Sequence, residues 1–184
     1  FIFHQGKLNQ WKRFEHKKFT IWIAGINKKE KFIKLKNVLF DEPDIKKILD
    51  IFGNHFGLTI LSKNFIFAVS DYSRSYPIFW KLDQDKLLLS PQANLLKSKL
   101  DKINQNQLQA FRMSGYTIND KTLWYNINNL KNSSYLLCRK YNKPLIKQYF
   151  IYQPWKIKNY SFLKFSKILK IEINKLFLNI IKEA

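Results

Sequence analysis

Short strand-like segments joined by tight turns are the feature that most constrains the fold of this chain. Two apolar runs of strand length, residues 56–61 and 65–70, flank the turn sequence Ser62-Lys63-Asn64, which is typical of a hairpin. Two further runs, 77–80 and 86–90, follow at short intervals. Consecutive short strands with tight connections predict an antiparallel sheet, because parallel pairing needs long crossovers between strands.

Two more strand signals lie outside this region. Phe19 to Ala24 places its aromatic and branched residues on one side, which predicts a strand with one strongly buried face. Residues 134–139 and 145–150 flank Asn142-Lys143-Pro144, and this pattern predicts a second hairpin. The charged stretch from Asn27 to Lys36 is predicted to be an irregular loop or a sheet edge.

Helices are predicted between these strands. One begins at Asp41 as N-cap, with Pro43 in its first turn, and ends at Gly53, because its apolar residues recur at helical spacing. Short helices are predicted near residues 92–98 and 105–113. A long amphipathic helix is predicted to follow Ser161 as its cap. Strands and helices together predict an α+β fold.

The chain has 184 residues, enough for one compact domain with a substantial core. The polar linker at Gln153-Pro154-Trp155-Lys156 predicts a boundary between a domain at 1–153 and a second segment at 154–184. The chain begins at Phe1 without Met, and the last helical pattern still runs at Ala184. We therefore expect it to be part of a longer protein.

The net charge of +20 raises the alternative of a basic nucleic-acid-binding module. The excess is nearly all Lys, dispersed along the chain, whereas readers of phosphates and bases favour Arg for its bidentate geometry. The abundance of Lys, Asn, Ile and Phe is expected from AT-rich codons, so we predict no nucleic-acid partner. No apolar run has the length needed to cross a bilayer, so no membrane partner is predicted. The single Cys rules out a disulfide framework within this chain, so a reducing cytoplasm is the expected location.

Few residues offer catalytic or metal-binding chemistry. Cys138 is the only Cys in the chain and lies in an apolar strand pattern without a neighbouring His, which favours a structural role over a nucleophilic one. The three His residues fit no metal-ligand spacing, so no metal site is predicted. Asp71 and Arg74 are the best polar pair. An ion pair that stabilises the turn is favoured over a contact to another domain.

A series of motifs from Gly53 onward resembles the asparagine synthase family. The segment Phe67-Ala68-Val69-Ser70-Asp71 and the following Pro77-Ile78-Phe79-Trp80 are similar to the family's strand that ends in Asp and its turn into Pro-Leu-Phe. Gly53-Asn54-His55-Phe56-Gly57 resembles Gly-x-Phe-Ala, with one extra residue and Gly in place of Ala. The strand at 86–90 resembles the family's next strand, with Pro91 where Glu is usual.

The order of motifs continues downstream. Gly115-Tyr116 and Thr122-Leu123-Trp124 match the family's Gly-Tyr and Thr-Leu-Phe at similar intervals. Asn132-Ser133 replaces the family's Pro-Gly, and Tyr149-Phe150 stands where the family has an aromatic pair. The resemblance covers residues 41–184 well and the first 40 poorly.

The resemblance implies an N-terminal glutamine amidotransferase domain with the Ntn-hydrolase fold, an αββα sandwich of two stacked antiparallel sheets. It also implies that the helix after Ser161 begins an ATP-pyrophosphatase domain. That domain would be the partner of the present one, and it would bind a small-molecule substrate. ATP and Mg²⁺ are expected there, and no cofactor is expected in the present chain.

The resemblance also locates the residues of glutamine chemistry. The family's Asn-Gly-Glu, which holds the oxyanion and the substrate, aligns near Ala24 and Gly25, so the amide and the carboxylate are missing. The family's substrate-binding Asp corresponds to Glu42. Phe1 to Phe3 resembles the strand that follows the nucleophilic Cys, and the interval to Gly25 is too short for the family's Arg-bearing loop. Asp71, Arg74 and Pro77 form the motif expected at a turn or domain interface.

These positions predict a degenerate domain with no catalytic residue of its own and a structural role in an amide-forming ligase. The loss of several charged hydrogen bonds, each worth about 1.5–3 kcal/mol, disfavours glutamine hydrolysis. The alternatives are an active glutaminase that supplies ammonia to the synthetase domain and a nucleic-acid-binding module.

Overall fold

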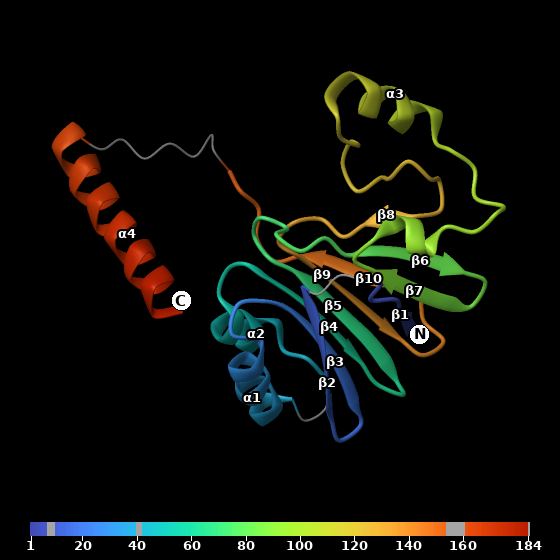
Figure 1. Ribbon diagram of the computed structural model, residues 1–184, viewed down its shortest axis with the longest axis horizontal. Helices are drawn as coiled ribbons and strands as arrows, with labels where there is room; N and C mark the ends of the chain where they lie inside the picture. Colours follow the sequence, from blue (N-terminus) through green and yellow to red (C-terminus); the bar gives the residue numbers. More distant parts are fainter. Residues whose placement is uncertain (7–9, 40–41, 154–160, 184) are drawn as a thin grey trace. The chain divides into compact units, whose positions relative to one another are not determined.

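The computed structural model describes residues 1–6, 10–39, 42–153 and 161–183. Its contacts divide the chain into two compact units, Phe1–Phe150 and Ile151–Ala184. The first unit is an α+β fold with two mostly antiparallel sheets (Figure 1). The second contains one helix, α4 (Phe162–Glu183), and the Ser161 hydroxyl accepts a hydrogen bond from the Lys164 N–H at 3.4 Å, as expected of a cap.

The larger sheet has six strands in the order β10-β9-β5-β4-β3-β2. All neighbours in it pair antiparallel. The strands are β2 (Trp11–His16), β3 (Phe19–Gly25), β4 (Phe56–Leu61), β5 (Phe65–Ser70), β9 (Ser134–Arg139) and β10 (Leu145–Gln148). Both predicted hairpins, β4–β5 and β9–β10, are therefore confirmed.

The smaller sheet has four strands in the order β1-β7-β6-β8. They are β1 (Ile2–Phe3), β6 (Phe79–Asp83), β7 (Lys86–Ser90) and β8 (Asn128–Asn129). Both runs predicted at 77–80 and 86–90 form strands, although β6 begins two residues later than expected, and the two strands pair as a hairpin. β1 and β7 pair parallel, so this sheet is not wholly antiparallel.

Alternating side chains of the larger sheet form two separate cores. Phe65, Phe67 and Val69 of β5 face α1 (Lys28–Val38) and α2 (Ile45–Phe52), which cover one side of the sheet. Ile66 and Ala68 face the other way and pack with Leu87 and Leu89 of the smaller sheet. Because β5 is buried on both sides, the two sheets are stacked with β5 inside the fold.

The prediction of an irregular segment at Asn27–Lys36 is wrong, because α1 occupies most of it. The helix has a narrow apolar stripe, with Phe32 stacked on Phe14 at 4.5 Å between ring centroids and Leu35 fully buried. Its remaining residues are mostly Lys, which have good helix propensity but hide the periodicity.

The start of the next helix also differs from the prediction. The N-cap of α2 is Asp44, whose carboxylate accepts a hydrogen bond from the Lys46 N–H at 2.9 Å, and Pro43 precedes the helix. Asp41 lies outside the described residues. The stop at Gly53 is confirmed, because its N–H donates to the Leu49 carbonyl at 2.8 Å.

The segment between β7 and β9 contains the 3-10 helix η1 (Ala93–Leu96) and α3 (Gln105–Ser114). The predicted helix at 92–98 is thus shorter and tighter than expected. In Figure 1 the segment extends away from the smaller sheet and returns to it at β8. No residue of α3 is buried, so its anchorage depends on the residues at its two ends.

Candidate functional site

The ends of β3, β4 and β5 meet where the resemblance places the oxyanion site. Gly25 closes β3 opposite Phe56 of β4 and has a φ of 125°, which side chains rarely adopt. A Cβ at this position would lie 2.7 Å from the backbone oxygen of His55. Only Gly fits both the dihedral angle and the close approach.

The Asp71 carboxylate fastens this end of the sheets. It is 1% exposed and accepts hydrogen bonds from the Phe56 N–H at 3.0 Å and the Ser75 N–H at 2.8 Å. The Asp71 carbonyl accepts from the N–H groups of Ser133 at 2.8 Å and Arg74 at 3.3 Å. One residue therefore joins the starts of β4 and β9 to the turn after β5, and we call these contacts the Asp71 clamp.

The predicted ion pair of Asp71 with Arg74 is wrong. Within the described residues the Asp71 carboxylate contacts backbone N–H groups and no Arg74 guanidinium atom. Arg74 is exposed and has a φ of 53°, so it serves the turn through its backbone. Pro77 is half-buried and leads into Ile78, whose carbonyl accepts from the Leu130 N–H at 2.8 Å.

Ala24 contributes only a methyl group to this region. It is fully buried in the core between the sheets, in the same cluster as Trp11 and Trp22. The Trp11 indole lies against Gly57, where a Cβ would come within 2.7 Å of the ring. The absence of a side chain at Gly57 thus makes room for the indole, which fills this side of the Gly25 end.

Glu42 does not lie near Gly25. Its carboxylate forms a two-pronged ion pair with Arg139, with both N–O distances at 2.7 Å. Arg139 pairs with Phe65 at the start of β5, whereas Gly25 lies beside the strand end at Ser70. Five residues of strand separate those two ends, roughly 17 Å at about 3.4 Å per residue. The two positions that the resemblance assigns to one substrate site are therefore apart.

The start of β1 lies at the same far end as Glu42. Phe1 lines a cavity with Lys63 and Arg139, and the strand then runs toward Trp11, whose carbonyl accepts a hydrogen bond from the Gln5 side chain at 2.6 Å. A residue directly before Phe1 would thus lie at the opposite end of the strands from Gly25.

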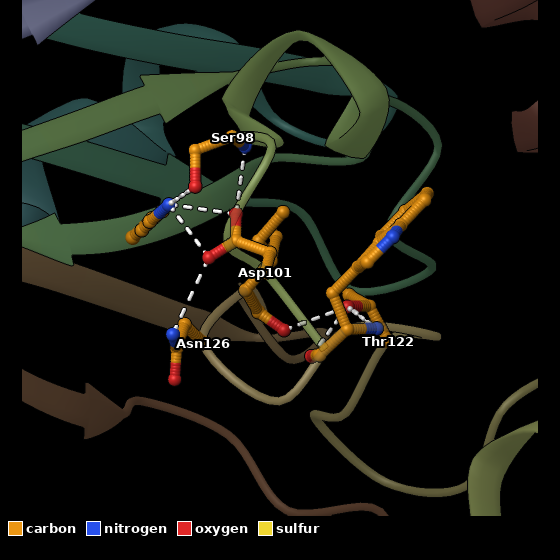
Figure 2. A network of polar contacts seen from close by, with 7 residues as sticks. Ser98, Asp101, Thr122 and Asn126 are labelled. Atoms are coloured by element: carbon orange, nitrogen blue, oxygen red, sulfur yellow. Dashed lines mark hydrogen bonds and ion pairs between the residues drawn. The ribbon is translucent and has the colours of Figure 1, made fainter. Parts of the chain in front are cut away.

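A buried ion pair that the sequence did not reveal joins Lys81 of β6 to Asp101, and Figure 2 shows the contacts around Asp101. The Lys81 ammonium contacts both carboxylate oxygens of Asp101 at 2.7 and 2.9 Å, and the two side chains are 4% and 3% exposed. The Ser98 N–H and the Asn126 amide also donate to Asp101, at 2.8 and 3.3 Å. These contacts join both ends of the α3 segment to β6.

Charged hydrogen bonds determine the ionisation of Asp101. Burial raises the pKa of its carboxyl, but the hydrogen bonds from Lys81, Ser98 and Asn126 outweigh burial and bring the pKa to about 2. Nearby, the Thr122 hydroxyl donates to the Ile127 carbonyl at 2.7 Å and accepts from the Trp124 N–H, which fixes the returning turn. The polar atoms of this network bind one another, and the network therefore anchors the α3 segment to β6.

Cys138 is buried in β9, as its apolar pattern predicted. Its thiol donates to the carbonyls of Asn142 at 3.2 Å and Arg139 at 3.6 Å. Burial raises its pKa, so the reactive thiolate is disfavoured at neutral pH. Within the described residues, no group of three or more His, Cys, Asp and Glu side chains is arranged to hold a metal ion.

Ser133 is held in an unfavourable conformation beside the Asp71 clamp. It has a φ of 54°, it is fully buried, and its hydroxyl has no hydrogen-bond partner among the described residues. Replacing Ser133 by Gly is expected to raise the free energy of unfolding by about 1 kcal/mol, because the dihedral strain and the unpaired hydroxyl both disappear. Urea unfolding measures the change.

The neighbouring Ser134 is the matched control for this substitution. It lies in β9 and its hydroxyl donates to the Asn132 carbonyl at 3.2 Å. Ser134→Gly should lower the free energy of unfolding, because it adds only flexibility and loses a contact. A loss of stability in Ser133→Gly as large as in Ser134→Gly would contradict the strain at Ser133.

Within the described part of the chain, no helix combines the length and the apolar character that a bilayer-spanning segment needs. Comparison of the sequence with models of protein families gave no match. Comparison with curated proteins gave no significant match either.

Proposed function

We propose that this chain is an Ntn amidotransferase-like domain that does not hydrolyse glutamine and serves a structural role in an asparagine-synthase-like, ATP-dependent, amide-forming ligase. Its two stacked sheets would then be the inner layers of an αββα sandwich. The partner of the domain would be the ATP-pyrophosphatase domain of the same protein, where ATP, Mg²⁺ and the carboxylate substrate bind.

Local geometry at three motif positions supports the family resemblance. Gly25 has a conformation and an environment that accept only Gly. Asp71 directly follows its strand, and its two carboxylate oxygens accept hydrogen bonds from Ser75 of the following turn and from Phe56 of β4. Ser133 replaces the Gly of the family's Pro-Gly and has the positive φ that favours Gly. In each case the backbone conformation or the backbone hydrogen bonds explain why this residue type stands at the position, without any role in glutamine chemistry.

The separation of the substrate positions carries the proposal of a non-hydrolysing domain. Glutamine hydrolysis needs a nucleophile, oxyanion donors and substrate-binding charges within one site. Here Gly25 lies at one end of the strands, and Glu42 lies at the other end in an ion pair with Arg139. Ala24 presents a buried methyl group where the family has an amide.

The structural role is supported by the interactions at the Gly25 end. Each oxygen of the Asp71 carboxylate accepts one N–H group, and His55 Nδ1, just before β4, lies 2.9 Å from the Ser75 hydroxyl in the turn after β5. These contacts hold three chain segments in one arrangement. A rigid end of this kind suits a domain that presents a fixed surface to its partner.

An activity test on the full product of the open reading frame distinguishes this proposal from an active glutaminase. The protein is incubated with glutamine, and released glutamate is measured. It is also treated with 6-diazo-5-oxo-L-norleucine, a glutamine analogue that alkylates the nucleophile of glutaminases. The intact mass of the protein is then measured by mass spectrometry. We expect no glutamate above the blank and no adduct, because the substrate contacts are not assembled.

The variant Cys138→Ser is the control for non-specific alkylation at the buried thiol. Saturable glutamate release, or an adduct that persists in Cys138→Ser, would overturn the proposal of a non-hydrolysing domain. The proposal that the protein is a ligase is tested separately, by reading the gene sequence downstream of this chain. The reading frame is expected to encode a nucleotide-binding Ser-Gly-Gly-x-Asp-Ser motif downstream of Ala184, and a stop codon directly after Ala184 would remove the ligase from the proposal.

A further inference from the structure

A cavity of about 640 Å³ opens between the two sheets at the end opposite Gly25. The turns of the three hairpins β4–β5, β6–β7 and β9–β10 surround it, and the start of β1 contributes Phe1. Its volume lies within the range of pockets that hold small organic molecules. It shares no residue with the Asp71 clamp or with the Lys81–Asp101 network.

The mouth of the cavity carries an excess of positive charge. Lys63, Lys140 and Lys143 are exposed on its rim, on two different hairpin turns. Among the described lining residues, Asp85 supplies the one carboxylate. The fourth cation of the lining, Arg139, is neutralised by its ion pair with Glu42. Three ammonium groups therefore remain for a ligand, and together they favour one that carries more than a single negative charge.

Hydrogen bonds within the protein fix the rim and occupy three of its backbone carbonyl oxygens. The Lys140 N–H donates to the Asn64 carbonyl at 2.8 Å and so joins the turns of β4–β5 and β9–β10. The Arg139 carbonyl accepts from the Asn142 N–H at 3.0 Å, and the Asn142 carbonyl accepts from the Cys138 thiol at 3.2 Å. These three backbone oxygens are therefore bound within the protein and do not face an anion in the cavity.

The floor of the cavity is apolar. It includes Phe1 and the buried side chains of Leu87 and Cys138. At the mouth, Tyr141 is 92% exposed, and the Lys140 ammonium lies 4.8 Å from the centre of its ring. An exposed ring beside a cation provides a face on which a flat ligand can stack.

We propose that this cavity is a binding site for an organic phosphate, with the phosphate group held by Lys63, Lys140 and Lys143 and an apolar or aromatic body placed against the floor and Tyr141. A phosphate dianion matches a cluster of ammonium groups better than a single carboxylate does. The apolar floor adds affinity that inorganic phosphate does not gain.

Three probes separate the contributions of the phosphate charge and of the aromatic ring system to binding. 2-Naphthyl phosphate combines a phosphate with an aromatic body, inorganic phosphate provides the charge alone, and 2-naphthol provides the body alone. Isothermal titration of the full chain is expected to show 2-naphthyl phosphate binding at least roughly tenfold more tightly than either simpler probe. Equal binding of 2-naphthyl phosphate and inorganic phosphate would overturn the role of the floor.

Matched charge variants locate the site. Lys140→Gln combined with Lys143→Gln should weaken 2-naphthyl phosphate binding roughly tenfold, because two of the three free cations are lost. Lys28→Gln combined with Lys29→Gln removes the same charge from the start of α1, near Gly25 at the opposite end of the sheets. This pair should leave affinity within about twofold, since distant charges are screened. Equal losses of affinity in the two double variants would show general attraction to a basic protein and would overturn the proposal. Absence of 2-naphthyl phosphate binding at millimolar concentration would overturn it as well.

Discussion

Replacement of Asp101 by Ala is expected to lower the free energy of unfolding by about 3 kcal/mol. The substitution leaves the Lys81 ammonium almost completely buried without its carboxylate, and breaking one side of a buried pair costs about 3–5 kcal/mol. It also removes the acceptor for the Ser98 N–H and the Asn126 amide. Urea unfolding followed by Trp fluorescence measures the loss.

Two controls show whether burial is the cause. Glu15→Ala breaks the exposed ion pair with Arg13, which is expected to cost under about 1 kcal/mol. The double variant Lys81→Met with Asp101→Leu removes both charges and should be more stable than Asp101→Ala alone. If Asp101→Ala cost no more than Glu15→Ala, the pair would contribute nothing as a buried anchor.

The same pair gives the stability a dependence on pH with a defined sign. The pKa of Asp101 is about 2 in the folded chain, below the value of about 3.9 for an unfolded Asp. A lowered folded pKa means that the contribution is complete above pH 4 and is lost as the pH falls from about 4 to about 2. Asp101→Asn should therefore flatten the acid limb of the stability curve relative to the original protein.

Replacement of Asp71 by Ala is expected to cost about 3 kcal/mol as well. Two backbone N–H groups, those of Phe56 and Ser75, lose a charged acceptor, and hydrogen bonds to charged groups contribute about 1.5–3 kcal/mol each. Asp71→Asn keeps one acceptor oxygen and should lose about half as much. Hydrogen exchange offers a local readout, since the amides of Phe56 and Ser75 should lose protection first.

Arg74 is the matched control for the clamp. Because its side chain is exposed and its φ is positive, Arg74→Gly should leave the free energy of unfolding unchanged or slightly higher. A loss comparable to that of Asp71→Ala would indicate that the side chain of Arg74 does stabilise the turn. Unchanged exchange at Phe56 in Asp71→Ala would contradict the clamp itself.

Elements with strong local signals were predicted well. The β4–β5 and β9–β10 hairpins follow from alternating or continuous apolar runs around turn residues, and the order of those runs predicts antiparallel pairing. β2 was missed because it is an edge strand whose outward positions carry Lys and Arg. α1 was missed because few of its residues are apolar.

The candidate site was predicted less well, because a site depends on distances between segments. Gly25 and Asp71 were identified, and their roles follow from backbone geometry at strand ends. Glu42 was placed beside Gly25 by the order of motifs, yet the return of the chain through α1 brings it to Arg139. The Lys81–Asp101 pair gave no sequence signal, since the two residues are separated along the chain and each resembles an ordinary surface charge.

The amino-acid pattern alone predicts the α+β class, the hairpins, the Gly53 helix end and the burial of Cys138, because each depends on the residues of one local segment. Contacts between distant segments determine the parallel pairing of β1 with β7, the position of Glu42, the Asp71 clamp and the charged cavity between the sheets. The physical reason is that hydrogen bonds and charges act over a few ångströms in space. Only the folded chain fixes which distant residues come that close.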